Sequence, residues 1–415
     1  MEYDEDMLNA ELSELHDRFE SDKKQLERLE KDVGGLQDGA SELLEVSTNE
    51  QREWAEAFLG DSEIAKKAER LLKLQSEWVG RFNVLHGFRE PLLRRAEIVA
   101  STCVGLTAAS DVGNLEFDLC IIDEASKATA MEACVPFSRS KKWVLVGDSK
   151  QLPPFREEIL ASAELRSRYK LESEEAVESL FERFRRKLPA ANQAMLTKQY
   201  RMVEPIGRMV SECFYDGQLE SMRKNVDAAL SGISGRVANW FTTADLPDRV
   251  EEQAGLSFVN TAEAAIVCQL LQRVNDILRQ SEKPGRRDVL VLSGYKGQVT
   301  HLHRRLIPLQ SSLDKLDVEC CTIDRVQGQQ ADIVVFSVTR SNELARAGFL
   351  RALERINVAL SRARELLVIV GDHAFVEKAE GAESLHDVIR HMRRNPGECF
   401  LGPFPQPQTP RGGSR

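Results

Sequence analysis

The hydrophobic and polar positions of the first 96 residues follow the repeat of an amphipathic helix. Apolar residues recur at alternating spacings of three and four, at Leu12, Leu15, Phe19, Leu26, Leu29, Val33 and Leu36. Asp22 is the one polar residue at a position of this repeat. After the glycines near residues 34–39, a second apolar stripe follows at Trp54, Phe58, Leu71, Leu74, Trp78, Phe82 and Leu85. The pattern predicts an antiparallel helical hairpin, either a coiled-coil arm for spacing or partner contact or a clamp on nucleic acid.

From Glu97 onward, short continuous apolar runs replace the helical repeat. The runs are Ile98–Ala100, Leu119–Ile122, Trp143–Val146, Leu256–Val259, Val289–Leu292, Val318–Cys321, Ile333–Phe336 and Leu367–Val370. Such runs are typical of parallel strands covered on both faces, and the stretches between them, such as residues 262–280, have helical patterns. Polar residues collect where the first strands end, which is where open α/β sheets bind ligands. The sequence therefore predicts an α/β fold.

Changes in texture divide the chain into four expected parts. Residues 1–96 form the helical arm, 97–188 a first α/β domain, 189–400 a second α/β domain, and 401–415 a tail. The tail is rich in proline, glycine and polar residues, so we expect it to be disordered.

The net charge of −10 is concentrated in the arm. Residues 1–96 carry 14 Lys and Arg against 23 Asp and Glu, so the other 319 residues carry a net charge of only −1. A nearly neutral body can hold a local basic groove, and the local field is what captures phosphates. The overall acidity therefore does not exclude a nucleic-acid partner, and the acidic arm is a candidate surface for a protein partner.

Other features of the composition narrow the class of protein. No apolar run approaches the roughly 18 residues that a membrane span needs, so we expect no membrane partner. The acidic start, Met1–Asp6, is unlike a secretory or mitochondrial signal, and we expect a cytoplasmic or nuclear protein. The eight cysteines include no C-x-x-C pair, which favours buried, reduced thiols over a zinc or disulfide site.

Two carboxylates at the end of the second run suit phosphoryl transfer. Asp123 and Glu124 follow Leu119–Ile122 directly. The first carboxylate can hold Mg²⁺, and the second can orient and deprotonate an attacking water. An Asp-Glu pair at a strand end is also a common helix N-cap, so this segment alone leaves both interpretations open.

The next run ends in a polar turn that strengthens the phosphate interpretation. Gly147 permits the turn, and Asp148 and Gln151 can sense a phosphate or its metal from the neighbouring strand end. The alternative is an ordinary turn closed by Pro153 and Pro154.

Three later segments carry aromatic or basic groups. Tyr200 offers a ring that can stack on a base, and Arg201 a guanidinium that can pair with a phosphate. Arg355 and Arg362 lie seven residues apart in a segment that we interpret as a helix, hence on nearly one face. In isolation, residues 199–202 also fit a segment with a core tyrosine, residues 322–332 a polar turn, and residues 355–364 a solvated basic helix.

In chain order these segments resemble the motifs of superfamily 1 helicases of the Upf and senataxin type. Residues 101–105 are similar to the family's nucleic-acid-contacting loop, 123–126 to its Walker B, 147–154 to motif III, 199–202 to the arginine-bearing motif that opens the second domain, 294–298 to motif IV, 322–332 to motif V and 355–364 to motif VI. The resemblance covers about residues 97–375. It implies two RecA-like domains that unwind or remodel RNA or DNA at the expense of ATP.

The resemblance also implies a role for each matching residue. ATP would bind between the two domains, with Mg²⁺ on Asp123. The residues implied in catalysis are Asp123, Glu124 as the base, and Gln151, Arg201 and Arg362 around the γ-phosphate. Those implied in nucleotide binding are Gly147, Asp148, Gln199, Tyr200 stacked on adenine, Gly328, Gln330 and Arg355. Those implied in contacting single-stranded RNA or DNA are Ser101, Thr102, Tyr295, Gln298 and Thr322.

The sequence departs from the family's pattern in three ways. Lys127 and Gln330 stand where the family usually has glutamine and glutamate. The 415 residues contain no G-x-x-x-x-G-K-[ST] loop, which in the family precedes every segment named above. We therefore expect a first RecA-like domain without its opening strand and P-loop, and a chain that is inactive by itself. The rival hypothesis is a non-catalytic scaffold, built on a truncated helicase core, whose acidic coiled coil recruits a partner.

Overall fold

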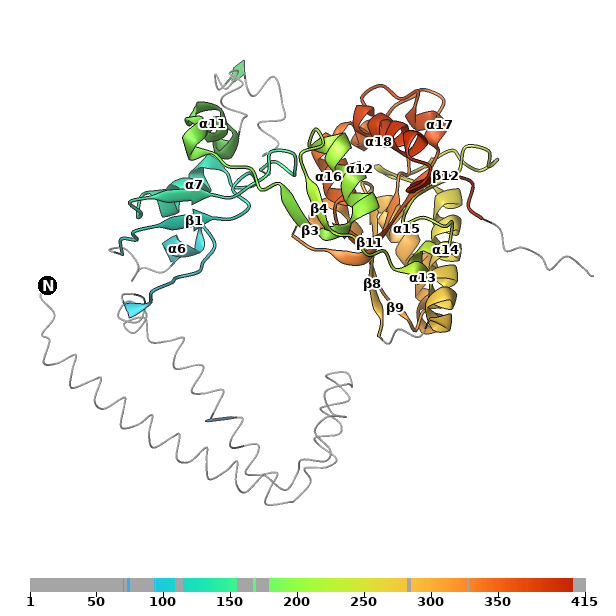
Figure 1. Cartoon of the computed structure of the whole chain (residues 1–415), viewed down its shortest axis with the longest axis horizontal. Helices are drawn as coiled ribbons and strands as arrows, with labels where there is room; N and C mark the ends of the chain where they lie inside the picture. Colours follow the sequence, from blue (N-terminus) through green and yellow to red (C-terminus); the bar gives the residue numbers. More distant parts are fainter. Residues whose placement is uncertain are drawn as a thin grey trace, which may run out of the picture. The chain divides into compact units, whose positions relative to one another are not determined.

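The computed structural model describes residues 70, 73–74, 93, 95–108, 115–154, 167–168, 179–281, 285–326 and 328–405 (Figure 1). The chain divides into two compact units, Met1–Leu115 and Glu116–Arg415. The helical hairpin predicted for residues 1–96 falls almost wholly outside the described residues, and it stays a prediction. So do the domain boundaries expected at residues 97 and 189.

In the described part of the first unit, Gly105–Ala108 form the short helix α6, and residues 70, 73–74, 93 and 95 are also helical. The strand predicted for Ile98–Ala100 is wrong, because these residues have no regular structure. Ile98 is 88% exposed and its segment forms no ladder with another strand of the described chain. An apolar run without a pairing partner has no ladder hydrogen bonds to hold it extended.

The second unit begins with a parallel pair of strands. β1 (Cys120–Ile122) pairs with β2 (Trp143–Leu145), and α7 (Ala130–Phe137) connects them. One face is covered, since the Phe137 and Trp143 rings stack at 4.5 Å. On the other face the paired residues Ile121 and Val144 are 63% and 44% exposed. The expectation of strands covered on both faces therefore holds for only one face of this pair.

A six-stranded parallel sheet forms the core of the rest of this unit. Its order is β12-β5-β11-β10-β8-β9. The strands are β5 (Ala238–Thr242), β8 (Arg287–Ser293), β9 (Leu316–Thr322), β10 (Ala331–Ser337), β11 (Ala363–Gly371) and β12 (Cys399–Gly402). Every residue of β10 is buried, as is most of β11, which accounts for their continuous apolar sequences. The predicted α/β fold with parallel strands is confirmed.

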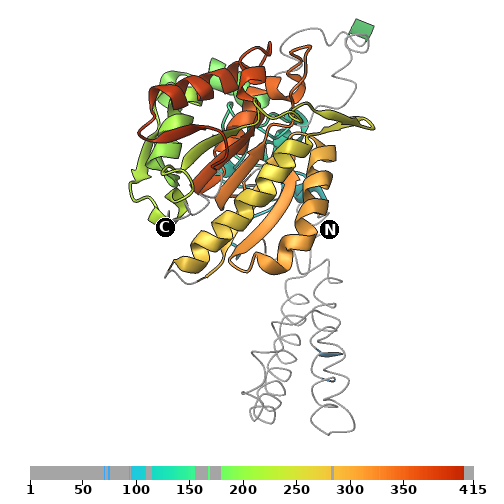
Figure 2. The same ribbon diagram turned by 90° about the vertical axis from the view of Figure 1, so that its right-hand side faces the viewer.

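Helices cover this sheet in two groups. α14 (Thr261–Gln280) and α15 (Lys296–Leu306) lie side by side in front of the strands in Figure 2, and α12, α16 and α18 pack together as the second group. The bounds of this second group are α12 (Glu204–Phe214), α16 (Leu353–Leu360) and α18 (Glu383–Arg394). The other helices and short 3-10 turns of this unit are α11 (Leu180–Lys187), Ala190–Asn192, α13 (Ala228–Ser231), Ile307–Ser312, Ile323–Arg325, Gly348–Arg351 and α17 (His373–Val376). Within the described segments, no helix is long and apolar enough to cross a membrane.

Two small strand pairs lie outside the main sheet. β3 (Lys198–Val203) and β4 (Glu220–Arg223) are parallel, whereas β6 (Glu252–Ala254) and β7 (Ser257–Val259) form an antiparallel hairpin. The run Leu256–Val259 is therefore not the buried strand of a parallel sheet that we predicted. Gly255, with a φ of +62°, makes the tight turn, and Leu256 beside it is fully exposed.

Two further expectations need correction. The helix predicted over residues 355–364 ends at Leu360, and Arg364 already belongs to β11, so Arg355 and Arg362 do not share a helix face. The tail expected from residue 401 starts too early. β12 continues to Gly402 beside β5, and the Phe404 ring lies 5.1 Å from that of Phe241 in an edge contact. The remainder of the tail lies outside the described residues.

Candidate active site

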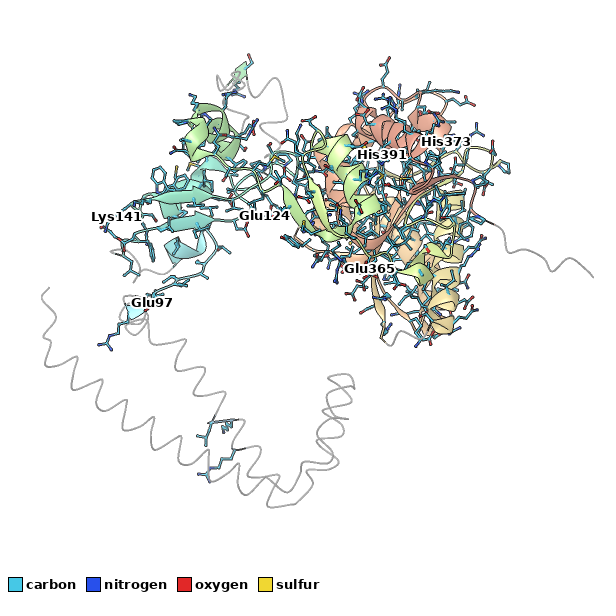
Figure 3. The ribbon with its side chains drawn as sticks, in the orientation of Figure 1. Glu97, Glu124, Lys141, Glu365, His373 and His391 are labelled. Atoms are coloured by element: carbon cyan, nitrogen blue, oxygen red, sulfur yellow. The ribbon has the colours of Figure 1, made fainter. Side chains whose placement is uncertain are left out.

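The Asp123-Glu124 pair occupies a tight turn directly after β1. The backbone N–H of Glu124 donates to Asp123 Oδ1 at 2.9 Å, and the N–H of Ala125 donates to Val146 O at 2.8 Å. Glu124 has a φ of +53°, a left-handed conformation that is uncommon for residues other than glycine and that concentrates at functional sites. The turn keeps the Asp123 side chain exposed at the strand end, beside Glu124, which is labelled in Figure 3.

The turn after β2 packs against the first one. A Cβ on Gly147 would lie 2.8 Å from the backbone nitrogen of Ser126, so only glycine allows this approach. The N–H of Asp148 donates to Ser126 Oγ at 3.3 Å, and Gln151 Nε2 donates to Asp148 Oδ2 at 2.9 Å. These contacts join the two predicted phosphate-binding turns.

Arg362 reaches the second turn from the loop after α16. Its side chain is only 1% exposed, and Nη2 donates to Gln151 Oε1 at 3.3 Å. Its other hydrogen bonds go to Val358 O, Gln329 O and Ser361 Oγ, which are all neutral acceptors. The structure thus brings together two residues, Gln151 and Arg362, that the resemblance assigned to the γ-phosphate.

Arg201 lies close enough to Arg362 to affect its proton affinity. Burial, followed by the positive charge of Arg201, lowers the pKa of Arg362 to about 10. Burial also lowers the pKa of Arg201, while the negative charge of Glu124 opposes the shift in both arginines. Within the described chain neither guanidinium forms an ion pair, although the carboxylates of Glu124 and Asp148 lie near enough to Arg362 to raise its pKa against these shifts.

Strand β3 is held in place by contacts that do not use the Arg201 side chain. Arg223 of β4 donates from Nη1 to the backbone oxygen of Arg201 at 2.7 Å, and its Nη2 lies 3.1 Å from Glu365 Oε1 in β11 (Figure 3). Arg201 Nη1 itself donates to Ser361 O at 3.1 Å, next to Arg362. The backbone of β3 is therefore fixed to the main sheet, and it directs Arg201 toward the loop of Arg362.

Gln199 and Tyr200 have different environments although they are neighbours. The Gln199 amide donates to Met202 O and Ser221 Oγ and accepts from the N–H groups of Arg201 and Met202. Gln199 thus shapes the turn around Arg201. The Tyr200 ring is 69% exposed and stays open to a stacking partner.

The remaining residues assigned to the nucleotide are less directly placed. Gly328 has a φ of +79° in an exposed turn, and Gln330 beside it is exposed. Arg355 donates from Nε to Asp324 Oδ1 at 3.0 Å, and its guanidinium lies 4.5 Å from the centre of the Phe349 ring. Arg355 is therefore engaged by Asp324, and the structure gives it no contact with the cluster around Arg362.

The residues assigned to nucleic acid in this unit follow the ends of β8 and β9. Thr322 ends β9 in register with Ser293 of β8 and is half-buried. The Tyr295 hydroxyl accepts from Arg340 Nη1 at 3.1 Å and from the N–H of Phe349 at 3.0 Å.

Gln298 has no exposed surface, and its amide is bonded to Ser337 Oγ and to the backbone of Asn260. The Gln298 side chain is therefore not accessible for the contact with nucleic acid that the resemblance implied.

Ser101 and Thr102 belong to the other unit. Both are exposed, and Thr102 Oγ1 accepts from the N–H of Gly105 at 3.0 Å, which caps α6. This is an ordinary side-chain cap at a short helix, and it leaves the Ser101 hydroxyl bonded only to the neighbouring carbonyl of Thr102.

The residues present fit a magnesium-bound nucleotide. In the described part of the chain, no group of three or more His, Cys, Asp or Glu side chains could hold a metal ion. Mg²⁺ at Asp123 would therefore take most of its ligands from phosphate oxygens and water, which is how this ion is usually bound beside nucleotides. The arginine pair beyond it offers positive charge that a phosphate can neutralise.

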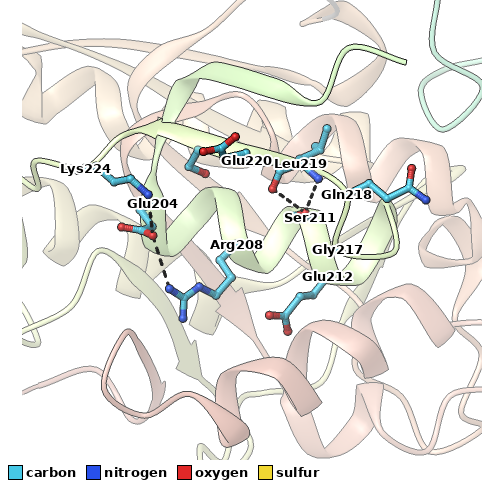
Figure 4. A pocket seen from close by; sticks show the side chains of 10 residues that line it. Glu204, Arg208, Ser211, Glu212, Gly217, Gln218, Leu219, Glu220 and Lys224 are labelled. Carbon is cyan, nitrogen blue, oxygen red and sulfur yellow. Dashed lines mark hydrogen bonds and ion pairs between the residues drawn. The ribbon is translucent and has the colours of Figure 1, made fainter. Parts of the chain in front are cut away.

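A surface groove elsewhere in this unit shares none of these residues. It has a volume of about 350 Å³ and lies over α12 and β4 (Figure 4). Its lining residues are Glu204, Arg208, Ser211, Glu212, Gly217, Gln218, Leu219, Glu220, Ser221 and Lys224. Glu204 already pairs with Lys224 at 3.0 Å and with Arg208 at 3.6 Å, so three of the charged residues that line the groove pair with one another.

Sequence reasoning missed two residues at the arginine cluster, Tyr215 and Asn357. The Tyr215 hydroxyl donates to Asp148 Oδ2 at 2.6 Å, and Asn357 Nδ2 donates to the Tyr215 hydroxyl at 2.8 Å. Asn357 carried a usable signal, because it is the one amide in the apolar run Ile356–Leu360. Tyr215 carried none.

Comparison with known proteins agrees with this arrangement. Two family models, both described as AAA domain, match residues 3–156 and 176–374. The Regulator of nonsense transcripts 1 of Dictyostelium discoideum is 30% identical over 334 residues, covering 77% of this chain and 23% of that protein. Helicase sen1 of Schizosaccharomyces pombe is 29% identical over 377 residues, covering 87% of this chain and 21% of that protein.

A third relative is the DNA-binding protein SMUBP-2 of Rattus norvegicus. It is 28% identical over 347 residues, covering 77% of this chain and 33% of that protein. The chain thus spans a third or less of the length of each of these three relatives. The two domain matches and the alignments with these helicase relatives nevertheless cover most of this chain. The chain belongs to the AAA-domain family of superfamily 1 helicases of the Upf and senataxin type.

Proposed function

We propose that this chain forms the catalytic and strand-binding part of an ATP-dependent helicase that acts on RNA or DNA. The observation that carries the proposal is the buried guanidinium of Arg362, which has only neutral hydrogen-bond partners and lies near a second cation, Arg201. Buried charges in proteins are normally paired. A phosphate group between Arg201, Arg362 and Gln151 would supply the direct ion-pair partner that neither arginine has in the described structure.

Each residue of the cluster has a separate task in this proposal. Glu124 accepts a proton from the attacking water, and its charge also lies near both arginines. Arg201 and Arg362 stabilise the charge that spreads over the transferred phosphoryl group, and Gln151 holds its oxygens in line. Asp123 would hold Mg²⁺, which supplies further stabilisation of that charge when it is bound. The exposed Tyr200 ring stacks on the adenine.

Single-stranded nucleic acid would pass over the polar ends of β8 and β9. Thr322 and Tyr295 lie there. By the family resemblance, the exposed Ser101 and Thr102 would also contact the nucleic-acid backbone. ATP binding and hydrolysis would then alternate between two arrangements of the domains and move the strand. Gln298 has no part in strand contact in this proposal, because its buried amide holds Asn260 and Ser337 together.

The sequence feature that favours a second candidate is the lack of a P-loop motif in these 415 residues. Without backbone N–H groups around the β-phosphate and the lysine of that motif, nothing in this stretch holds the triphosphate in line with Glu124. We propose that residues 1–415 alone neither bind ATP tightly nor hydrolyse it. The alternative function is a scaffold that recruits a protein partner through its acidic N-terminal segment.

Strand displacement tests the proposed function. The protein is a version of the chain that carries the P-loop segment of a relative at its N-terminus, and the substrates are RNA and DNA duplexes with single-stranded tails. We expect displacement that requires both ATP and Mg²⁺ and that is lost in Glu124→Gln. ATP hydrolysis without displacement of either duplex would leave an ATPase but reject the helicase.

A further inference from the structure

A chain of hydrogen bonds joins the turn after β2 to helices α12 and α16. The Tyr215 hydroxyl, just after α12, lies 2.6 Å from Asp148 Oδ2. Asn357 of α16 donates from Nδ2 both to the Tyr215 hydroxyl at 2.8 Å and to Lys150 O at 2.8 Å. The turn that carries Gln151 is thus held at two points, one on a side chain and one on the backbone.

The direction of each hydrogen bond in this chain is fixed by chemistry. Burial, followed by the negative charge of Asp148, raises the pKa of Tyr215 well above its usual value. The hydroxyl therefore stays protonated and donates a hydrogen bond to the Asp148 carboxylate. Its oxygen then accepts from Asn357. Lys150 O can only accept, so the amide nitrogen of Asn357 must face it. Reversing the amide would bring two oxygens together and break both bonds.

Asn357 is an unusual residue for its position. It has no exposed surface, its neighbours Ile356 and Val358 are also fully buried, and its Oδ1 has no hydrogen-bond partner within the described structure. A buried acceptor without a partner destabilises the fold. An apolar side chain at this place would avoid that cost, so the two bonds made by Nδ2 are the feature that distinguishes asparagine here.

We propose that Tyr215 and Asn357 are positioning residues that hold Gln151 in register with Arg362. Asn357 lies on the helix that leads into Arg362, and the turn it grips carries Gln151, whose Oε1 lies 3.3 Å from Arg362 Nη2. The pair therefore sets the spacing of the two groups that read the γ-phosphate. That last step rests on the proposed function, whereas the grip on the turn does not.

Hydrogen–deuterium exchange of residues 1–415 without nucleotide tests the grip. Tyr215→Phe removes one hydroxyl and keeps the ring, and Asn357→Ala removes both donors. We expect each variant to speed exchange of residues 147–151 by about tenfold while β8 to β11 keep their protection. Tyr295→Phe is the matched control, because its hydroxyl accepts from the N–H of Phe349. It should speed exchange at Phe349 and leave residues 147–151 unchanged.

Two results would overturn the proposal. One is unchanged exchange of residues 147–151 in both variants. The other is faster exchange throughout β8 to β11 in Tyr215→Phe, because the hydroxyl would then hold the fold and not the turn.

A kinetic arm separates positioning from mere packing and from failure of the proposed function. In the version that carries a P-loop segment, Tyr215→Phe should lower kcat for ATP hydrolysis about tenfold with KM within about twofold, since the spacing matters most in the transition state. A fall in kcat/KM that comes entirely from a higher KM, with kcat unchanged, would reject the positioning role. If that version hydrolyses no ATP at all while the exchange results stand, the proposed function fails and the grip on the turn remains.

Discussion

At the scale of single residues, the central feature is a buried guanidinium, that of Arg362, which has no ion-pair partner in the described structure. Arg362 donates to three backbone or hydroxyl oxygens and to the amide of Gln151, and it repels Arg201. A cation in such a place is matched to an anion that arrives during the reaction. Its contribution is therefore expected in the transition state, where negative charge on the phosphoryl group is redistributed.

Arg362→Ala should lower ATP turnover far more than ATP binding. Arginines aimed at a transferring phosphoryl group are worth about 10³ to 10⁵ in rate. In the version with a P-loop segment, we expect kcat to fall by orders of magnitude with a modest change in KM. Arg362→Lys keeps the charge but loses the fork, so it should recover only part of the rate. Steady-state kinetics with a loss below about tenfold in Arg362→Ala would reject the assignment.

Tyr200→Ala should weaken nucleotide binding without disturbing the fold. The ring is 69% exposed and makes no stacking contact with another ring in the described structure, so its removal leaves no cavity. Stacking of a base on an aromatic ring is worth about 1–3 kcal/mol, which corresponds to roughly a tenfold to hundredfold weaker dissociation constant. Tyr200→Phe keeps the ring and is the control. Equal nucleotide affinity in the alanine variant and the parent would contradict the stacking role.

The amides among the predicted site residues differ in their surroundings. Gln151 and Arg362 were assigned to one phosphate group and do lie together. Gln199 and Gln298 were assigned to ligands, yet both amides bond inward. Charged side chains avoid burial unless something pairs with them, whereas a glutamine can satisfy itself on nearby backbone. The motif pattern alone does not distinguish these two uses of an amide.

At the scale of elements, the parallel pairing of the main sheet brings the carboxyl ends of its six strands to one edge. Continuous apolar runs identified β8, β10 and β11, because these strands are buried along most of their length, and a shorter run identified β9, an edge strand that exposes Asp317 and Glu319. The sequence analysis missed β5, whose Asn239 and Trp240 interrupt an apolar pattern although both are fully buried. It also missed β12, whose pairing with β5 depends on residues far apart in the chain.

The link between α14 and the end of β10 gives a testable pH dependence. Glu263 of α14 is fully buried, and it accepts from Ser337 Oγ at 2.6 Å and from the N–H of Thr339. Burial raises its pKa to about 8. The folded chain therefore binds the Glu263 proton more tightly than the unfolded chain does. Protonation of Glu263 stabilises the fold fully below about pH 4.5, and this contribution to the free energy of unfolding is lost as the pH rises through about 8.

Glu263→Gln should remove this dependence. The free energy of unfolding of the parent is expected to fall relative to that of the variant between about pH 5 and pH 8, measured by urea denaturation at both ends of the range. The difference between the two proteins isolates Glu263 from the other titrating groups. A difference that stays constant across this range would show that the buried carboxyl titrates at its ordinary pKa.

At the scale of the whole molecule, we propose that the chain supplies the hydrolytic side of a nucleotide site and a surface for single-stranded nucleic acid. The described residues contain carboxylates at the end of β1 and arginines from β3 and from the loop after α16, whereas the 415 residues contain no P-loop motif. Phosphoryl transfer depends mostly on positioning and charge, so a site without its phosphate cradle loses nearly all of its rate. Affinity for nucleic acid does not depend on that cradle.

Residues 1–415 should therefore bind single strands weakly without nucleotide. Binding that relies on phosphate contacts weakens with salt, with a slope of about −0.7 for each phosphate neutralised on a single strand. We expect fluorescence anisotropy with labelled oligonucleotides to show binding at low salt that disappears as salt is raised. Affinity that is independent of salt would indicate a different mode of recognition.

The central claim is that Glu124 and the arginine cluster form the hydrolytic half of an ATP site that a P-loop completes. Phosphate release stimulated by single-stranded nucleic acid tests it most directly, in residues 1–415 alone, in the version with a P-loop segment, and in that version with Glu124→Gln. The account predicts turnover only in the second protein. Equal turnover by residues 1–415 alone, or turnover that survives Glu124→Gln, would contradict it.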